Sequence, residues 1–271
     1  MGNLVVAGTD GSSSSFAAVE TAAVEARRRR ADLRVVYALN WPVRPMYSPL
    51  DTTPINRLVS EAAERARSVA PEVTVTEAMV PGDTVSVLEA ESREADLLVL
   101  GARGAGGLLG MLLGSTAAAV TAHSRCPVMV ARGESPETET GPVVLCVDGS
   151  PASEAAVEFA FAEAALRGAR LAAVHVWLPD YAPPGTGVES AERLLVQALA
   201  GHAEKYPDVT VRHEVASGEV REVLIERSRT AQLVVAGARG RGGFTGLLLG
   251  SVSQALLHHA HSSVAVVRSG A

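Results

Sequence analysis

The chain contains the same sequence pattern twice, and this repetition limits its fold more than any other feature. Residues 101–115 read GARGAGGLLGMLLGS and residues 237–251 read GARGRGGFTGLLLGS, with eleven of fifteen positions identical at an offset of 136. The triplet Asp10-Gly11-Ser12 returns as Asp148-Gly149-Ser150 at an offset of 138. A pattern kept at a fixed offset is the signature of repeated structural units. The sequence therefore predicts two copies of one domain.

The boundary between the copies is predicted in a short acidic stretch. This stretch reads Arg132-Gly-Glu-Ser-Pro-Glu-Thr-Glu-Thr-Gly141 and carries no large apolar side chain. Such a composition is typical of a linker. We predict a first domain over residues 1–134, a linker over 135–141 and a second domain over 142–271.

Hydrophobic patterning predicts an α/β fold with a parallel sheet in each copy. Short Val-rich runs alternate with amphipathic segments, which favours βαβ units. Runs such as Leu97–Leu100 and Leu233–Ala236 fit strands that are covered on both faces. In the first copy, strands are predicted at Leu4–Gly8, Leu33–Leu39, Val73–Met79, Leu97–Gly101 and Val128–Ala131, and helices at about Ser14–Arg30, Ile55–Val69, Thr84–Glu94 and Thr116–Ser124. In the second copy, strands are predicted at Val143–Val147, Leu171–Val176, Val209–Val215, Leu233–Gly237 and Val264–Val267. Open sheets of this kind bind ligands beyond the carboxyl ends of their strands.

Composition excludes several functional classes. The 271 residues are 47% hydrophobic but only 4% aromatic, so the core must be built from Val, Leu and Ala. A net charge of −6 argues against a dedicated nucleic-acid binder, which needs a basic surface. Two cysteines can form at most one disulfide bond, which cannot stabilise a chain of this length, so a reducing compartment is favoured. The sequence shows no basic leader and no apolar run of about 18 residues. We therefore expect a soluble, cytoplasmic protein without nucleic-acid or membrane partners.

The repeated glycine-rich segment predicts an anion site. It leaves an apolar strand and enters a helix that begins near a serine, and we call residues 101–115 and 237–251 the glycine loops. Glycines let the backbone approach a ligand closely, and bare N–H groups at a helix N-terminus attract an anion. A phosphate fits best. The predicted phosphate contacts are Gly101, Arg103, Gly104, Gly114 and Ser115 in the first copy, and Gly237, Arg239, Gly240, Gly250 and Ser251 in the second.

The glycine loops match neither of two common phosphate-binding motifs. The chain has no Gly-Lys-Ser or Gly-Lys-Thr, so the loops are not Walker motifs, and they follow the fourth strand instead of the first, unlike the dinucleotide fingerprint. A merely flexible connection is the alternative, and two copies at one spacing disfavour it. Ser251 and Gln254 have the form of a capping box, so the Ser251 hydroxyl has a competing role. Ser115 lacks that partner and is the better candidate for a phosphate contact.

An aspartate ends the first strand of each copy, at the sheet edge where the glycine loop begins. The carboxylate of Asp10 or Asp148 could accept a hydrogen bond from a ribose hydroxyl or help to hold a divalent cation beside phosphates. The alternative is a turn-forming Asp-Gly followed by Ser12 or Ser150 as a helix N-cap. The two roles are compatible.

The histidines, the cysteines and the search for a hydrolase motif give no indication of a catalytic or metal site. His258, His259 and His261 offer no third ligand at a suitable spacing and fit a helix end near the dipole. Cys126 and Cys146 sit at strand positions and are interpreted as buried, inert thiols. No Gly-x-Ser-x-Gly elbow for a hydrolase occurs.

These motifs together resemble the universal stress protein family, as a tandem member. The resemblance covers nearly the whole chain and rests on the Asp-Gly-Ser after the first strand, the Gly-x2-Gly-x9-Gly-Ser loop and the closing Cys-Pro-Val-Met-Val or Ser-Ser-Val-Ala-Val strand. It implies a doubly wound, five-stranded parallel sheet of order 3-2-1-4-5 in each copy, of the adenine nucleotide alpha hydrolase-like type. Because members with the glycine motif resemble ATP-binding domains, it also implies ATP as ligand, with or without Mg²⁺.

The resemblance also implies the residues of two adenine nucleotide sites. The adenosine pockets would be lined by Asp10 and Ala38 in the first copy, and by Asp148 and Val176 in the second. Gly8, Thr9 and Val147 are further candidate nucleotide-binding residues. Ribose and phosphates would be held by the glycine loops together with Thr116 and Val252. The first copy departs from the family pattern at Thr9, where an apolar residue is usual, and Ala38 is smaller than Val176.

The resemblance further implies how the domains associate and what the chain does. The fifth strands, Val128–Ala131 and Val264–Val267, would pair to form an intramolecular pseudo-dimer, and a homodimer of the chain is compatible with this. We expect an ATP-binding stress-response regulator or sensor. No positioned general base is recognisable, so we do not expect a turnover enzyme. A slow ATPase and a nucleotide-free interaction module are the alternatives.

Overall fold

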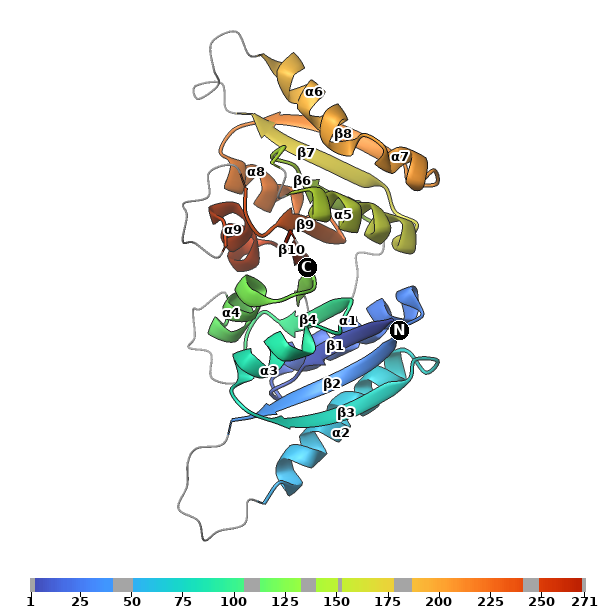
Figure 1. Ribbon diagram of the computed structural model, residues 1–271, viewed down its shortest axis with the longest axis vertical. Coiled ribbons are helices and arrows are strands. Elements are labelled where there is room, and N and C mark those ends of the chain that lie inside the picture. Colours follow the sequence, from blue (N-terminus) through green and yellow to red (C-terminus); the bar gives the residue numbers. More distant parts are fainter. Residues whose placement is uncertain are drawn as a thin grey trace. The chain divides into compact units, whose positions relative to one another are not determined.

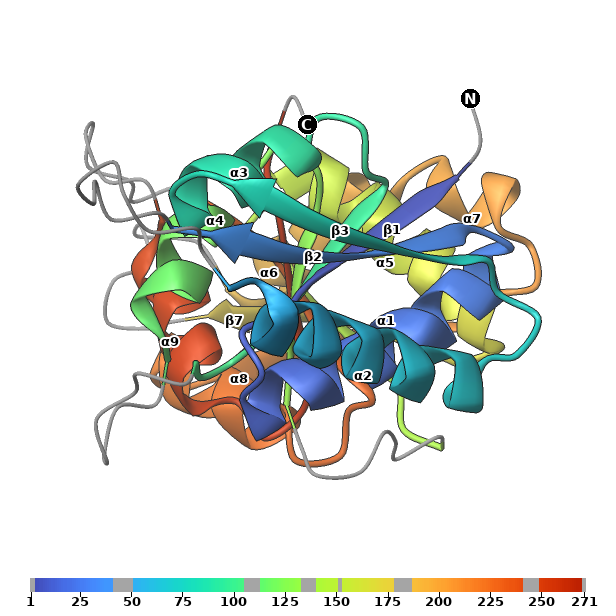
Figure 2. The same cartoon turned by 90° about the horizontal axis from the view of Figure 1, so that it is seen from below.

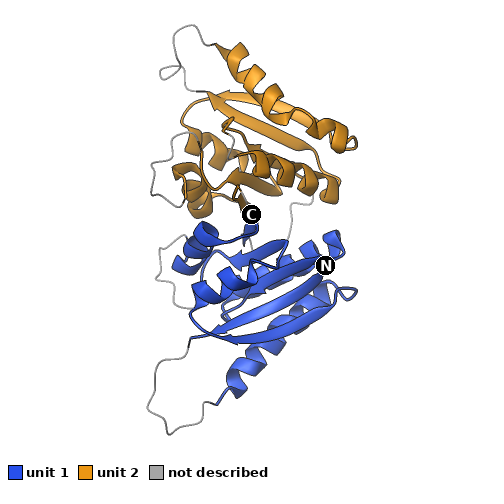
Figure 3. Cartoon of the chain, viewed as in Figure 1, with its two compact units in different colours: residues 1–136 blue, residues 137–271 orange. Residues whose placement is uncertain are grey.

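The chain divides into two compact units, residues 1–136 and 137–271 (Figure 3). The computed structural model describes residues 3–40, 51–104, 113–132, 140–150, 153–177, 187–240 and 249–269. The predicted linker over 135–141 falls largely outside these ranges, so its limits stay a prediction. The predicted pairing of the two fifth strands concerns how the units are placed relative to each other, and it also stays a prediction.

Unit 1 is a parallel sheet covered by helices on both faces. Its strands are β1 (Leu4–Gly8), β2 (Asp32–Leu39), β3 (Val75–Pro81), β4 (Leu97–Gly101) and β5 (Val128–Ala131), and its helices are α1 (Ser13–Arg29), α2 (Thr53–Val69), α3 (Thr84–Glu91) and α4 (Ser115–His123). The strand order is β3-β2-β1-β4-β5, with every pairing parallel. Helices α1 and α2 cover one face of this sheet, and α3 and α4 cover the other (Figures 1 and 2).

Unit 2 repeats this architecture. Its strands are β6 (Val143–Cys146), β7 (Leu171–Trp177), β8 (Val211–Ser217), β9 (Leu233–Gly237) and β10 (Val264–Val267), and its helices are α5 (Glu154–Arg167), α6 (Val188–Leu199), the short α7 (His202–Lys205), α8 (Val220–Arg227) and α9 (Ser251–His259). The order β8-β7-β6-β9-β10 is again parallel. Each unit therefore has the predicted 3-2-1-4-5 order and the predicted doubly wound α/β fold.

The third strand of each unit is the one that the sequence pattern misplaced. It begins at Val75 or Val211, two residues later than predicted. The reason is that Val73 and Val209 are buried in a turn, where their N–H groups donate to Ala70 and Tyr206 carbonyls at 3.1 Å. Burial of an apolar side chain is thus achieved here without strand pairing.

The core consists mainly of Val, Leu and Ala, as the composition predicted, with Phe161 and Met129 also fully buried. Strands β4 and β9 are almost fully buried, because helices cover both faces of the sheet. None of the described helices combines the length and the apolar character needed to cross a membrane.

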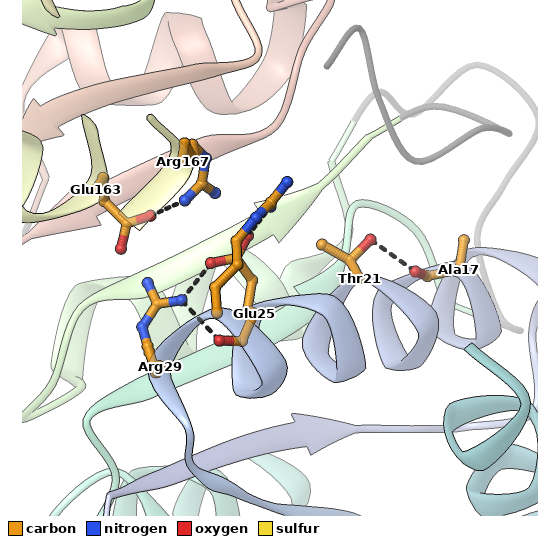
Figure 4. Close-up of polar contacts among 7 residues, drawn as sticks. Ala17, Thr21, Glu25, Arg29, Glu163 and Arg167 are labelled. Atoms are coloured by element: carbon orange, nitrogen blue, oxygen red, sulfur yellow. Dashed lines mark hydrogen bonds and ion pairs between the residues drawn. The ribbon is translucent and has the colours of Figure 1, made fainter. Parts of the chain in front are cut away.

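A buried ion pair occupies the same place on the first helix of each unit. Glu25 pairs with Arg29 in α1, and Glu163 pairs with Arg167 in α5 (Figure 4). Both carboxylate side chains are 1% exposed, and the arginines are 9% and 4% exposed. A buried charge is tolerated only when it is paired, so removing one partner of either pair should destabilise the packing of its helix.

The first helix of each unit ends in a left-handed residue, but the residue types differ. Arg30 has φ 52° and is the only described non-glycine residue with positive φ, whereas its counterpart Gly168 has φ 59°. Left-handed backbone costs a non-glycine residue about 1–2 kcal/mol. Glycine would relieve this strain but would also raise the conformational entropy of the unfolded chain, which offsets part of the gain. We therefore expect Arg30→Gly to stabilise unit 1 by about 0.5–1 kcal/mol.

The same change made in reverse is the control. Gly168→Arg should destabilise unit 2 by a similar amount, although no atom would obstruct a Cβ there. Urea denaturation of both variants measures the two effects. Equal stability of Arg30→Gly and the unaltered chain would contradict the strain assigned to Arg30.

Candidate functional site

The fold brings the aspartates and the glycine loops to one sheet edge in each unit. Strand β1 pairs in parallel with β4, with Ala7 opposite Val99, and β6 pairs in parallel with β9, with Leu145 opposite Val235. Parallel neighbours end at the same edge, so the residues that follow them converge. Asp10 therefore lies beside the loop after Gly101, and Asp148 lies beside the loop after Gly237.

One carboxylate oxygen of each aspartate shapes the turn after the first strand. Asp10 Oδ1 accepts the Ser12 N–H at 3.0 Å, and Asp148 Oδ1 accepts the Ser150 N–H at 2.9 Å. The predicted Asp-Gly turn is confirmed, and the intervening glycine has φ 81° or 71°. Ser12 caps α1 by accepting the Ser15 N–H at 3.1 Å. The N-cap prediction was wrong for Ser150.

In unit 2 the helix after the turn begins later than the sequence suggested. The N-cap of α5 is Ser153, and its N–H and its hydroxyl both donate to the Ser150 carbonyl. Ser150 instead donates its own hydroxyl to Asp148 Oδ1 at 2.8 Å. The serine thus fixes the orientation of the carboxylate.

The second carboxylate oxygen lies against the glycine loop. A Cβ built on Gly104 would be 2.6 Å from Asp10 Oδ2, and one on Gly240 would be closer still to Asp148 Oδ2. Atoms cannot approach so closely, which explains why each position is glycine. The structure thus places the aspartate carboxylate, which is predicted to contact a ribose or a cation, directly beside the glycine loop that is predicted to contact phosphate.

The two ends of each glycine loop are joined by a backbone hydrogen bond. Gly114 N–H donates to the Ala102 carbonyl and Gly250 N–H donates to the Ala238 carbonyl, both at 2.8 Å. The middle of each loop, residues 105–112 and 241–248, lies outside the described residues. The described ends nevertheless bring Arg103 or Arg239, both exposed, to the helix that follows.

The helix after each loop starts at the predicted serine. Gly114 and Gly250 are the N-caps of α4 and α9, and no side chain caps either helix. Ser115 and Ser251 are exposed first residues, and Thr116 and Val252 are half-buried in the first turn. The capping-box interpretation of Ser251 was wrong, because Gly250 already takes the N-cap position. The first N–H groups of these helices have no intrahelical acceptor and face the loop end.

The remaining predicted residues lie at the same edge. Ala38 and Val176 are half-buried near the ends of β2 and β7. Gly8 packs so closely on Leu100 that a Cβ would lie 2.8 Å from its side chain. Thr9 and Val147 are both buried, and the polar Thr9 hydroxyl is within 3.1 Å of Ser15 Oγ. Thr9 therefore fits an apolar position because Ser15 satisfies its hydroxyl.

Sequence reasoning missed two arginines at this edge. Arg132 follows β5 directly, and the register that places Ala131 opposite Gly101 brings it beside Arg103. Burial, and then the positive charge of Arg103, lower the pKa of Arg132 below its ordinary value. Arg268 follows β10 in the same way, with Val267 opposite Gly237. Their common offset of 136 residues could have revealed both.

The two cysteines supply no reactive thiol to this edge. Burial raises the pKa of the Cys126 thiol to about 11 and of the Cys146 thiol to about 12, so both remain protonated and unreactive at neutral pH. Within the described ranges, no group of three His, Cys, Asp or Glu side chains is arranged to hold a metal ion.

Comparison with known proteins identifies the family. The model of the universal stress protein family matches residues 2–132 and 139–268. Universal stress protein Rv2005c of Mycobacterium tuberculosis is 37% identical, covering 97% of this chain and 96% of its own, and a universal stress protein of Mycolicibacterium smegmatis is 38% identical with the same coverage. A universal stress protein from Archaeoglobus fulgidus has the same fold, with a TM-score of 0.70 over 99% of both chains at 21% identity. The chain therefore belongs to the universal stress protein family and carries two family domains in tandem.

Proposed function

We propose that each unit binds one adenine nucleotide and that ATP is the preferred ligand. We further propose that the chain acts as a nucleotide-dependent regulator or sensor in a stress response. The base and sugar would lie along Ala38 and Asp10 in unit 1 and along Val176 and Asp148 in unit 2. The phosphates would lie at the glycine loop and the helix N-terminus that follows it.

The proposal rests on one glycine in each unit, Gly114 and Gly250, at a position where the backbone conformation and the described neighbours would accept a side chain. Among the described residues, the atom nearest to a Cβ on Gly114 or Gly250 would be 3.6 Å away, and φ is an ordinary −72° or −74°. Serine or aspartate would also cap the helix better than glycine. Glycine at this position in both units is best explained by the close approach of a ligand to the backbone.

The charges of the described residues match a nucleotide. The first amides of α4 and α9 have no intrahelical acceptor and attract phosphate oxygens, and Arg103 and Arg239 add a full positive charge. The Oδ2 atoms of Asp10 and Asp148 are acceptors, suited to a sugar hydroxyl. A Mg²⁺ ion carried by the triphosphate would find its preferred oxygen ligand in the same carboxylates.

We propose slow hydrolysis at most. A general base must lie within hydrogen-bond reach of the attacking water. The aspartates of the site already use Oδ1 to hold the turn, and Oδ2 faces the loop glycine. Such carboxylates are suited to binding, and a bound nucleotide that persists is what a sensor requires.

The test begins with the protein as purified. It is denatured, and the released adenine nucleotide is identified and counted; calorimetric titration of nucleotide-free protein with ATP, ADP, AMP and cyclic AMP follows. We expect two nucleotides per chain, with ATP bound in preference to AMP. Absence of binding in both experiments would overturn the proposal in favour of a nucleotide-free interaction module.

Phosphate release under saturating ATP and Mg²⁺ tests the regulatory half of the proposal. We expect no steady turnover above that of a Gly114→Ser/Gly250→Ser chain. Sustained release that this double variant abolishes would overturn the regulator assignment and make the protein an ATPase.

A further inference from the structure

The bases of the two glycine loops are held by serines that lie on different helices. In unit 1, Ser14 of α1 accepts the Arg103 N–H at 3.2 Å through Oγ, and Ser12 donates to the Arg103 carbonyl at 3.4 Å. In unit 2, the Ser253 hydroxyl of α9 lies 3.2 Å from the Ala238 carbonyl and 2.9 Å from the Gly250 carbonyl, and its one proton is shared between these two acceptors at the two ends of the loop. We call the Ser14 and Ser253 contacts the loop clasps.

The repeat shows that serine and alanine have been exchanged between the copies. Ser14 corresponds to Ala152 at the offset of 138 residues, and Ser253 corresponds to Ala117 at the offset of 136. An alanine side chain cannot form a hydrogen bond, so neither clasp can exist in the other unit. Among the described residues, each unit thus has one clasp of this kind, made from the helix before the loop in unit 1 and from the helix after it in unit 2.

The two clasps fix different parts of the site. The Ser14 clasp holds Arg103 and hence Gly104, the residue that lies against Asp10 Oδ2. Helix α1 passes so near that a Cβ on Gly101 would lie 2.7 Å from both Ser14 O and Oγ. The Ser253 clasp instead shares the Ala238 carbonyl with the Gly250 N–H, and it is buried. It therefore ties the start of the loop to the helix N-terminus.

We propose that Ser14 and Ser253 are positioning residues that hold the described ends of each glycine loop, at Arg103 in unit 1 and at Ala238 and Gly250 in unit 2, in their binding geometry before the nucleotide arrives. This inference rests on the proposed function. Loop ends that are held in place in advance lose less entropy on binding, so each clasp strengthens binding in its own unit. Because the clasps differ, the two sites are tuned separately, and loss of one clasp leaves the other site unchanged.

The clasp itself is tested without nucleotide. Amide hydrogen exchange, followed residue by residue by NMR, reports whether Oγ protects the Arg103 N–H. We expect Ser14→Ala to speed exchange at Arg103 about tenfold and to leave Arg239 unchanged. An unchanged Arg103 rate would overturn the inference.

The effect on binding is tested with one site blocked at a time. In a Gly240→Ala background, Ser14→Ala should weaken ATP binding about three- to tenfold, as expected for one hydrogen bond, and Ser14→Thr should restore most of it. In a Gly104→Ala background, Ser253→Ala should have the same effect on the other site. Ser13→Ala is the matched control, because Ser13 is the exposed neighbour of Ser14 in the same helical turn.

The outcomes separate this inference from the proposed function. Unaltered affinity in Ser14→Ala and Ser253→Ala, in a chain that does bind ATP, would overturn the positioning role alone. Equal weakening by Ser13→Ala would also overturn it, because the effect would then belong to the helix end and not to the clasp. A chain that binds no nucleotide would overturn the proposed function and this inference together.

Discussion

Replacing Arg167 by methionine is expected to lower the free energy of unfolding of unit 2 by about 3 kcal/mol. The change removes one charged partner of Glu163, whose side chain is 1% exposed, and breaking a buried ion pair costs about 3–5 kcal/mol. Methionine retains most of the volume of the arginine stem, so little of the loss comes from packing. Urea denaturation followed by the fluorescence of Trp177 in a Trp41→Phe background reports on unit 2.

Two companion variants show whether burial is the cause. Arg229 pairs with Glu226 at a surface where the side chains are 55% and 72% exposed, so Arg229→Met should cost less than about 0.5 kcal/mol. The double change Glu163→Leu/Arg167→Met removes both buried charges and should recover most of the stability. If Arg167→Met cost no more than Arg229→Met, the buried pair would contribute nothing to the packing of α5.

The fold was predictable because its strands are apolar runs bounded by turn residues. Strands β1, β4, β5, β9 and β10 begin and end where the sequence pattern placed them. The pattern failed at the third strand, because Val73 and Val209 are as apolar as strand residues but are buried by a turn. Hydrophobicity reports burial, and only the hydrogen-bond partner distinguishes a strand from a turn.

The site was predictable in outline and not in its contacts. Asp10 and the glycine loop converge because parallel strands end together, which follows from the element order alone. The Ser14 clasp joins residues 89 apart in the sequence, and no periodicity signals such a contact. The repeat did hold the remaining information: Arg132 and Arg268 share one offset, and serine and alanine exchange places at the clasps. Comparison of the two copies residue by residue would have exposed both.

Serine in place of both Gly114 and Gly250 is expected to weaken ATP binding at least tenfold at each site without lowering the melting temperature. Within the part of the chain that the structure describes, the nearest atom to a Cβ at either position is 3.6 Å away, and serine is a better N-cap than glycine by a few tenths of a kcal/mol. The folded chain therefore gains slightly, whereas a phosphate approaching the backbone meets a side chain. Calorimetric titration and thermal unfolding of the same samples measure the two effects.

Alanine at Gly104 and Gly240 supplies the contrasting case. A Cβ there collides with Asp10 Oδ2 or Asp148 Oδ2, so these changes must displace the carboxylate or the loop and should lower both affinity and melting temperature. Loss of affinity with falling stability is what any damaged fold would give. Loss of affinity with unchanged or rising stability at Gly114 and Gly250 arises only if those glycines serve a ligand. Full affinity in the serine variants would therefore remove the observation on which nucleotide binding is proposed.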